Sequence, residues 1–214
     1  MIVEEVMTKE VVTLSPTDKI ESALKLLKEH RIKHITITDD ANRVVGIVSD
    51  RDIRDAAPSI LAADQNMEIL ENPIKSIMSS PVITAHPLDF IEDIASIFYE
   101  HEIACVPVTL DNKLVGIVTE KDILYTLIQV TGIREQSSQI EIRVENKIGV
   151  LPKIAQIISD RNTNISSVFL YPARDNQSEK IIVLRIQTMN PMPIIDELKN
   201  QGYNVIWPNL PGFE

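Results

Sequence analysis

The sequence predicts an α+β fold in which two tandem copies of one unit precede a third, different unit. The first observation is that the segment starting at Met7 is repeated 71 positions later, from Met78. The second is that Gly46–Ile53 returns as Gly116–Ile123, with only Ser/Thr, Asp/Glu and Arg/Lys exchanges. The third is that the pattern after Gly132 becomes strand, helix, strand, strand, helix, strand.

The two copies keep their register over whole elements, which indicates a duplication. The apolar helix positions of the first copy are Ile20, Ala23, Leu24 and Leu27. Their partners in the second copy are Ile91, Ile94, Ala95 and Phe98. Both sets follow the i, i+3, i+4, i+7 spacing of a helix with one buried face. The final residues of these helices, His30 and His101, suit the negative end of a helix dipole better than a metal site.

Each copy therefore reads as an extended leading segment, a helix, two strands and a closing helix. In the first copy the strands are His34–Thr38 and Val44–Ser49, joined by a polar turn. The closing helices are expected at Asp50–Ala57 and Glu120–Thr131, the latter stopped by Gly132. Between the copies, a helical insert is a further expectation, formed around Leu61, Met67, Ile69 and Leu70.

The third unit begins at Gln139. Ile140, Ile142 and Val144 alternate with charged residues, as in a strand with one buried face. A helix stripe follows at Leu151, Ile154, Ala155 and Ile158. Strands are expected near Asn164–Tyr171 and Lys180–Thr188, a helix at Pro193–Asn200 and a last strand at Tyr203–Trp207. This βαββαβ order is that of the ferredoxin-like fold.

The repeated motif joins an apolar strand to a helix through Ser49 or Thr119, with Asp52 or Asp122 three residues later. The same spacing forms a capping box, which by itself contributes only about 1 kcal/mol to helix stability. The turn also directs free backbone N–H groups and a carboxylate to one place, which suits a ligand with hydroxyl and phosphate groups. Nearby Arg51, Arg54 and Lys121 either reach such a phosphate or are solvated helix charges.

The repeated unit resembles the CBS domain, which works as a tandem pair called a Bateman module. The resemblance rests on the Gly-hydrophobic-hydrophobic-Ser/Thr-x-x-Asp motif, present twice and in register. It implies an adenine nucleotide or other adenosyl compound as a regulatory ligand, with the acid holding the ribose hydroxyls. The ligand-binding residues that it implies are Val11, Val12, Thr13, His34, Ile35, Thr36, Ser49, Asp52, Val82, Ile83, Thr84, Cys105, Val106, Pro107, Thr119, Lys121 and Asp122.

The resemblance is less complete in the first copy, because Pro107 of the second copy corresponds to Thr36 there. Two implied residues also have simpler readings. Cys105 lies in a buried strand pattern and is better read as a packed thiol than as a nucleophile. His34 next to the first cleft contacts a ligand or is a half-buried strand histidine.

The third unit resembles the ACT domain, a regulatory module that often binds amino acids at subunit interfaces. Its turn keeps Gly149 and Leu151 of the family motif but lacks the Asp and Pro, so only a weak effector site is implied, at Asn146, Gly149, Val150 and Leu151. The expected boundaries are CBS domain 1 at 1–57, a linker at 58–73, CBS domain 2 at 74–132, a linker at 133–138 and the ACT domain at 139–214. This order resembles bacterial acetoin utilisation proteins, which implies regulation of acetoin or butanediol catabolism.

The composition limits the partners and the cellular location that we expect. The net charge of −10 opposes nucleic acids and anionic membranes as partners. No apolar run approaches the roughly 20 residues of a membrane span, and Glu4 and Glu5 interrupt any signal peptide. With one cysteine among 214 residues, no intrachain disulfide can form, so a cytoplasmic protein is expected.

No catalytic or metal-binding motif is recognisable in the sequence. We therefore expect a regulator without a resident cofactor rather than an enzyme of acetoin breakdown or a transcription regulator. A homodimer is expected, because both module families associate through their own faces and an open βαββαβ sheet leaves an edge strand. The sequence does not identify a partner protein.

Overall fold

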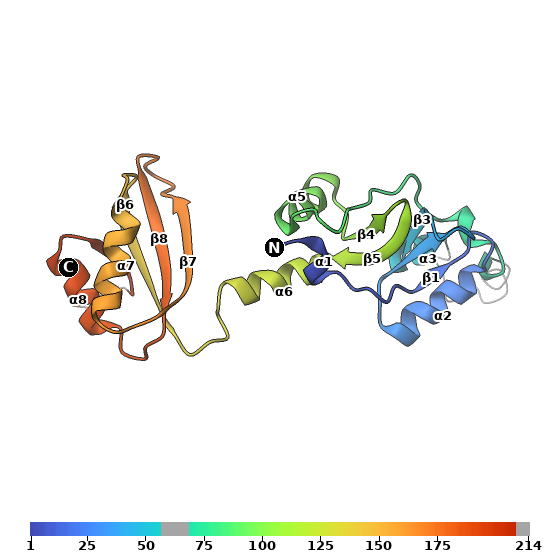
Figure 1. The fold of residues 1–214 in the computed structure, drawn as a ribbon. Coiled ribbons are helices and arrows are strands. Elements are labelled where there is room, and N and C mark those ends of the chain that lie inside the picture. The colour runs from blue at the N-terminus through green and yellow to red at the C-terminus, as the bar shows by residue number, and fades with distance from the viewer. Residues whose placement is uncertain (57–68, 209–214) are drawn as a thin grey trace. The chain divides into compact units, whose positions relative to one another are not determined.

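The computed structural model describes residues 1–56 and 69–208 of the chain. It divides into two compact units, residues 1–124 and 125–214 (Figure 1). The helical insert expected around Leu61 and Met67 lies outside the described residues. Of its expected members, Ile69 and Leu70 are described, and both pack against the core of the first copy.

The two copies lie in the first unit, except for the end of the last helix, which extends past Leu124. Each copy has a long helix, two strands and a closing helix in the same order, and within the described residues only the first copy has a strand before its long helix. The first copy consists of α1 (Val3–Val6), β1 (Thr13–Leu14), α2 (Ile20–His30), β2 (His34–Thr38), β3 (Val44–Ser49) and α3 (Asp50–Ala56). The second consists of η1 (Ile74–Ser76), α5 (Ile91–His101), β4 (Cys105–Leu110), β5 (Lys113–Thr119) and α6 (Glu120–Val130). The predicted helices and strand pairs are confirmed, and α6 ends one residue before the predicted Thr131.

The two long helices α2 and α5 bury the faces that the stripes predict. Their buried residues are Ile20, Ala23 and Leu27 in α2 and Ile91, Ile94 and Phe98 in α5. Both helices end at a residue in the left-handed conformation, Arg31 with φ 54° and Glu102 with φ 53°. This conformation reverses the chain toward the following strand. The strands then pair antiparallel, β2 with β3 and β4 with β5.

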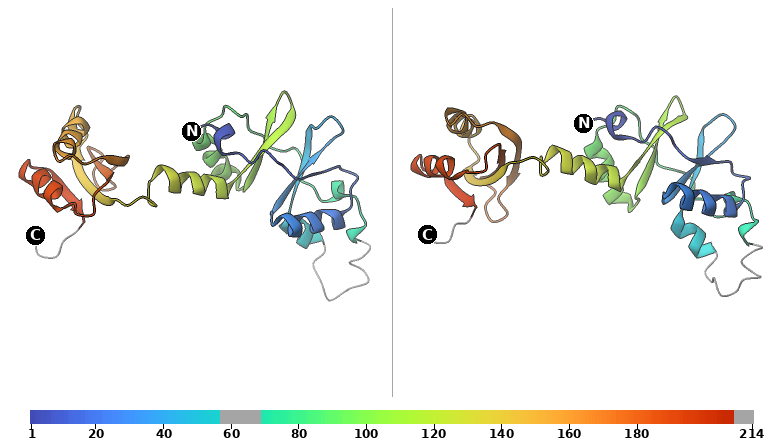
Figure 2. Two further views of the ribbon diagram at one scale, coloured as in Figure 1. Left: turned by 60° about the horizontal axis from the view of Figure 1, so that its bottom comes forward. Right: turned by 90° about the horizontal axis from the view of Figure 1, so that it is seen from below.

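The leading segment of each copy, which is the chain before β1 in the first copy and the equivalent chain before α5 in the second, pairs with the other copy. Thr8 and Ile117 exchange two backbone hydrogen bonds of 3.0 Å. The equivalent residues, Ser79 and Ile47, exchange bonds of 2.9 and 3.1 Å. In Figures 1 and 2 the N-terminal segment accordingly runs beside the elements of the second copy before it reaches β1. The sequence did not predict this exchange.

The two apolar cores contain the exchanged segments. Val3 of α1 is fully buried in the cluster formed by α5, β4 and β5. Ile74 of η1 is fully buried in the cluster formed by α2, β2 and β3. Each motif glycine lies against the leading segment of the other copy. A Cβ at Gly116 would overlap Sδ of Met7 and lie 2.9 Å from its Cγ. Gly46 has the same relation to Met78. Glycine therefore leaves room for the segment of the other copy.

The second unit has the predicted βαββαβ order. Its elements are β6 (Ser138–Glu145), α7 (Val150–Asp160), β7 (Ile165–Pro172), β8 (Glu179–Ile186), α8 (Met192–Asn200) and β9 (Asn204–Trp207). The sheet order is β7-β8-β6-β9 and all neighbours are antiparallel, as in the ferredoxin-like fold. The strand expected at Lys180–Thr188 is shifted, because it begins at Glu179 and ends at Ile186.

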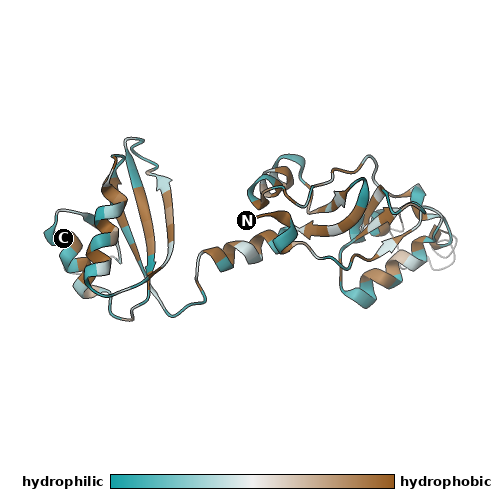
Figure 3. Cartoon of the chain, viewed as in Figure 1, coloured by the Kyte–Doolittle hydropathy of each residue, from teal (hydrophilic) through white to brown (hydrophobic). Residues whose placement is uncertain are grey.

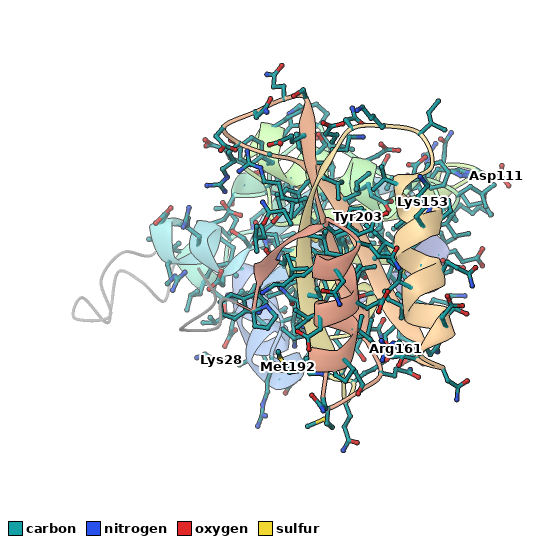
Figure 4. The ribbon with its side chains drawn as sticks, turned by 90° about the vertical axis from the view of Figure 1, so that its left-hand side faces the viewer. Lys28, Asp111, Lys153, Arg161, Met192 and Tyr203 are labelled. Atoms are coloured by element: carbon teal, nitrogen blue, oxygen red, sulfur yellow. The ribbon has the colours of Figure 1, made fainter. Side chains whose placement is uncertain are left out.

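Both helices of the second unit cover one face of its sheet. Apolar residues of β6, β8, α7 and α8 form one buried cluster, and Figure 3 shows the apolar residues along β8. Met192 and Tyr203 pack against its margin. Figure 4 shows α7 and α8 side by side and labels Arg161 at the end of α7, where its guanidinium donates a 3.2 Å hydrogen bond to Glu197 of α8. This exposed contact links the end of α7 to α8, while the buried apolar cluster holds both helices on the sheet.

Candidate functional site

The two motif turns have nearly the same geometry. Ser49 donates from its backbone N and from Oγ to Asp52 Oδ2, each at 2.7 Å. Thr119 donates to Asp122 Oδ2 from its backbone N at 2.9 Å and from Oγ1 at 2.7 Å. Both carboxylates are therefore held in one orientation. In the first copy the backbone N–H of Asp52 also donates to Ser49 Oγ at 3.2 Å, which completes a capping box there.

Each motif carboxylate has hydrogen-bonding capacity left. Among the described residues, no donor contacts Oδ1 of Asp52 or Asp122. The backbone N–H groups of Lys121 and Asp122, in the first turn of α6, likewise have no partner in the described part of the chain. A carboxylate oxygen and helix N-terminal N–H groups are thus available at the second turn, as a ligand with hydroxyls and an anionic group requires.

A cleft of about 510 Å³ lies at the second turn. Such a volume falls within the range of small-molecule sites. Four parts of the chain line it. The first copy contributes its leading segment and its α2–β2 turn, and the second contributes its α5–β4 turn and its motif. The lining residues are Thr8, Glu10, Val11, Val12, Arg31, Ile32, Lys33, His34, Ala104, Ile117, Thr119, Glu120, Lys121 and Asp122.

The exchange of leading segments explains this combination. Because Thr8 pairs with Ile117 on β5, the chain that follows, Glu10 to Val12, passes beside the end of β5 and the start of α6. The first copy thus contributes one wall of a cleft whose motif residues belong to the second. A single copy would contain only part of this site.

The predicted ligand-binding residues fall into two groups. Those that line the cleft are Val11, Val12, His34, Thr119, Lys121 and Asp122. Those that lie elsewhere are Thr13, Ile35, Thr36, Ser49, Asp52, Val82, Ile83, Thr84, Cys105, Val106 and Pro107. Among the second group, Ile35, Thr36 and Val106 are completely buried and present no surface to a ligand in this conformation. A ligand role for the residues outside the cleft stays a prediction.

Several lining residues were not predicted from the sequence. Thr8 and Glu10 were missed because their place depends on the exchange between copies. Arg31 and Glu120 are charged residues at helix ends, which sequence alone does not distinguish from solvated charges. The only local signal was that Arg31 follows the last residue of α2, where the chain turns back toward the cleft.

His34 lies close to both motif turns. It lines the cleft, and on β2 it is paired with Ser49 of the first motif. Burial lowers its pKa from 6.5, partly opposed by the negative charges of Asp50, Asp52 and Glu120, while Lys33 lowers it further. The imidazole is therefore neutral at neutral pH and offers one donor and one acceptor.

This pKa shift predicts a pH dependence of stability. Because the native pKa of His34 lies below that of the unfolded chain, the unfolded state binds more protons as the pH falls through 6.5. Protonation therefore destabilises the native state, and His34→Gln should reduce the loss of unfolding free energy on acidification. Urea denaturation at several pH values measures this. Parallel pH profiles for wild type and variant would refute it.

Cys105 is a packed thiol in the core next to the second turn. It is 5% exposed, and burial followed by the charge of Asp122 raises its pKa to about 12. The thiolate is the reactive form, so native protein should react very slowly with a thiol reagent at about pH 8. The same protein in urea should label rapidly at its only cysteine. Fast stoichiometric labelling of the native chain would contradict this prediction.

The turn expected as a weak effector site lies at the start of α7. Gly149 precedes the helix with φ 86°, a conformation that few other residues adopt. Asn146 donates its backbone N–H to the carbonyl of Ser178 at 2.9 Å. Val150 and Leu151 are in the first turn of the helix, and Leu151 is 40% exposed. An effector role for these four residues stays a prediction.

In residues 1–56 and 69–208, no group of three or more His, Cys, Asp or Glu side chains could hold a metal ion. Over the same ranges, no helix is long and apolar enough to cross a membrane.

The modular composition is established by family models. A model of the CBS domain matches residues 3–59 and 74–129, which together exceed half of the 214 residues. The chain therefore belongs to the CBS-domain family and carries the domain as a tandem pair. Residues 140–200 match a model of the AHAS small subunit-like ACT domain, so the expected ACT-like third unit is also confirmed.

Particular proteins are similar over part of the chain. A putative acetoin utilization protein (AcuB) from Vibrio cholerae is 30% identical, with a TM-score of 0.54 over 64% of this chain and 98% of that one. The CBS domain pair of protein MJ0100, in complex with 5′-methylthioadenosine and S-adenosyl-L-methionine, is 31% identical, with a TM-score of 0.52 over 59% of this chain and 95% of that one.

A longer relative is similar over only part of its own length. An uncharacterized 33.4 kDa protein in a ribosomal RNA operon of Thermofilum pendens is 31% identical over 136 residues, which are 61% of this chain and 45% of that protein. The match thus spans less than half of the length of that relative.

Proposed function

We propose that this chain is a regulatory protein that binds an adenosyl ligand in the cleft at Thr119 and Asp122. The observation that carries the proposal is the arrangement of Asp122, whose Oδ2 is held by Thr119 while Oδ1 stays available to ribose hydroxyls. The relative MJ0100 supports the ligand class, since its CBS pair was solved with two adenosyl compounds.

Binding would act by changing the balance between two conformations of the CBS pair. A ligand shifts such an equilibrium only if it binds one state more tightly. Support for this comes from the cleft, whose walls come from both copies, so that a ligand there would stabilise one arrangement of the two. The ACT-like unit or a second protein would receive the change.

The process and the assembly are further parts of the proposal. Similarity to the Vibrio cholerae protein over 98% of its length favours regulation of acetoin or butanediol catabolism. We propose a homodimer, a cytoplasmic location and no catalytic activity of the chain itself, with no nucleic acid or membrane as partner. Light scattering that finds only a 24.1 kDa monomer over a wide concentration range would refute the dimer.

The central experiment is calorimetric titration of ligand-free protein with AMP, ATP, 5′-methylthioadenosine and S-adenosylmethionine. We expect saturable binding of at least one of them. If none binds at millimolar concentration, the adenosyl proposal fails, and the CBS pair is a structural or protein-binding module. Mass spectrometry of natively purified protein adds an independent test, because a retained compound without an adenosyl group would also overturn the proposal.

A further inference from the structure

The cleft is richer in basic side chains than the chain as a whole. The basic residues that line it are Arg31, Lys33 and Lys121. The acidic ones are Glu10, Glu120 and Asp122. This balance occurs in a chain with a net charge of −10. Within the described residues, none of the three basic side chains forms an ion pair, so all three are available to an anion.

The duplication provides an internal comparison for two of these positions. The second-copy equivalent of Arg31 is Glu102, and the equivalent of Lys33 is Ala104. Arg31 and Glu102 have the same backbone conformation, with φ of 54° and 53°. The local structure is therefore kept while the charge is reversed at one position and removed at the other. Packing requirements do not account for basic residues at these two places.

We infer that Arg31 and Lys33 make this cleft selective for an adenosyl ligand with a phosphate at its 5′ position. The inference rests on the proposed function and specifies the ligand class. An uncharged 5′ group, as in 5′-methylthioadenosine, or the sulfonium of S-adenosylmethionine, is correspondingly the poorer ligand.

The structure of such a ligand places its phosphate within reach of Arg31 and Lys33. The 5′ group and the ribose hydroxyls belong to one small sugar, so holding the hydroxyls at Asp122 keeps the 5′ group inside the same cleft. Arg31 and Lys33 lie on the α2–β2 turn that lines the cleft. A guanidinium binds phosphate oxygens in pairs, while an ammonium group acts as a compact point charge. Lys121 adds a third positive charge from α6.

The test compares AMP with 5′-methylthioadenosine by calorimetric titration of the full chain. The variants are Arg31→Glu and Lys33→Ala, each the residue that the second copy carries at the equivalent position. The matched control is Lys28→Ala, an exposed lysine of α2 that does not line the cleft. We expect wild type to bind AMP at least about 10-fold more tightly than 5′-methylthioadenosine. Each cleft variant should lose about 10-fold in AMP affinity.

Binding of 5′-methylthioadenosine should change little in the variants, and the control should match wild type for both ligands. The inference is overturned if 5′-methylthioadenosine binds as tightly as AMP, or if the variants weaken both ligands equally. In these cases adenosyl binding itself persists and the proposed function stands. If none of AMP, ATP, 5′-methylthioadenosine and S-adenosylmethionine binds wild type, the proposed function fails together with the inference. Thermal melts of all variants identify any that are misfolded, and for these Lys33→Gln and Arg31→Gln replace the original substitutions.

Discussion

Replacing Asp122 with alanine should lower the affinity for the adenosyl ligand by about 10- to 100-fold. Hydrogen bonds to charged groups contribute about 1.5–3 kcal/mol, and the substitution removes the carboxylate of a residue that lines the cleft. Asp122→Asn keeps the shape and part of the bonding, so it should lose less. Calorimetric titration with whichever adenosyl compound binds wild type most tightly measures both changes.

Asp52 provides the matched control for this experiment. Its carboxylate makes the same hydrogen bonds to Ser49 that Asp122 makes to Thr119, but Asp52 does not line the described cleft. Asp52→Ala should therefore cost about 1 kcal/mol of stability, as loss of a helix cap does, with little effect on binding at Asp122. If Asp122→Ala behaves in the same way, both acids are only capping residues.

Local patterns predicted most of the elements, because each helix or strand here is specified by the spacing of its own apolar residues. The stripe of α5 and the alternation of β6 are examples, and both are buried as predicted. Boundaries shifted by one or two residues where hydrogen bonding decides the end. The β8 strand, for instance, ends at Ile186, two residues before the predicted end at Thr188.

The exchange of leading segments could not be read from the sequence. Val3 and Ile74 occupy equivalent positions, and either could pack on its own copy or on the other without any change in the local pattern. Prediction of the site residues was limited in the same way. Thr119 and Asp122 belong to a repeated motif and were predictable, whereas Thr8 and Arg31 reach the cleft only through the tertiary arrangement.

The exchange predicts that Ile74→Ala should destabilise the first copy, although Ile74 belongs by sequence to the second. Ile74 is fully buried among residues of α2, β2 and β3. Replacing a buried isoleucine with alanine typically costs about 2–5 kcal/mol. Urea denaturation followed by circular dichroism measures the loss, and hydrogen exchange with mass spectrometry locates it.

In the exchange experiment, Ile74→Ala should lower amide protection chiefly in α2, β2 and β3. Val3→Ala is the reciprocal variant, because Val3 is buried against α5, β4 and β5 and should lower protection there. Val3→Ala removes fewer side-chain atoms than Ile74→Ala does, so the loss of stability should be smaller. Protection lost in the copy to which each residue belongs by sequence would show that the leading segments do not cross.

The cleft depends on that crossing, since Glu10 and Val12 reach it only because Thr8 pairs with Ile117. Val3→Ala should therefore also weaken adenosyl binding more than Ile74→Ala does, relative to the stability that each variant loses.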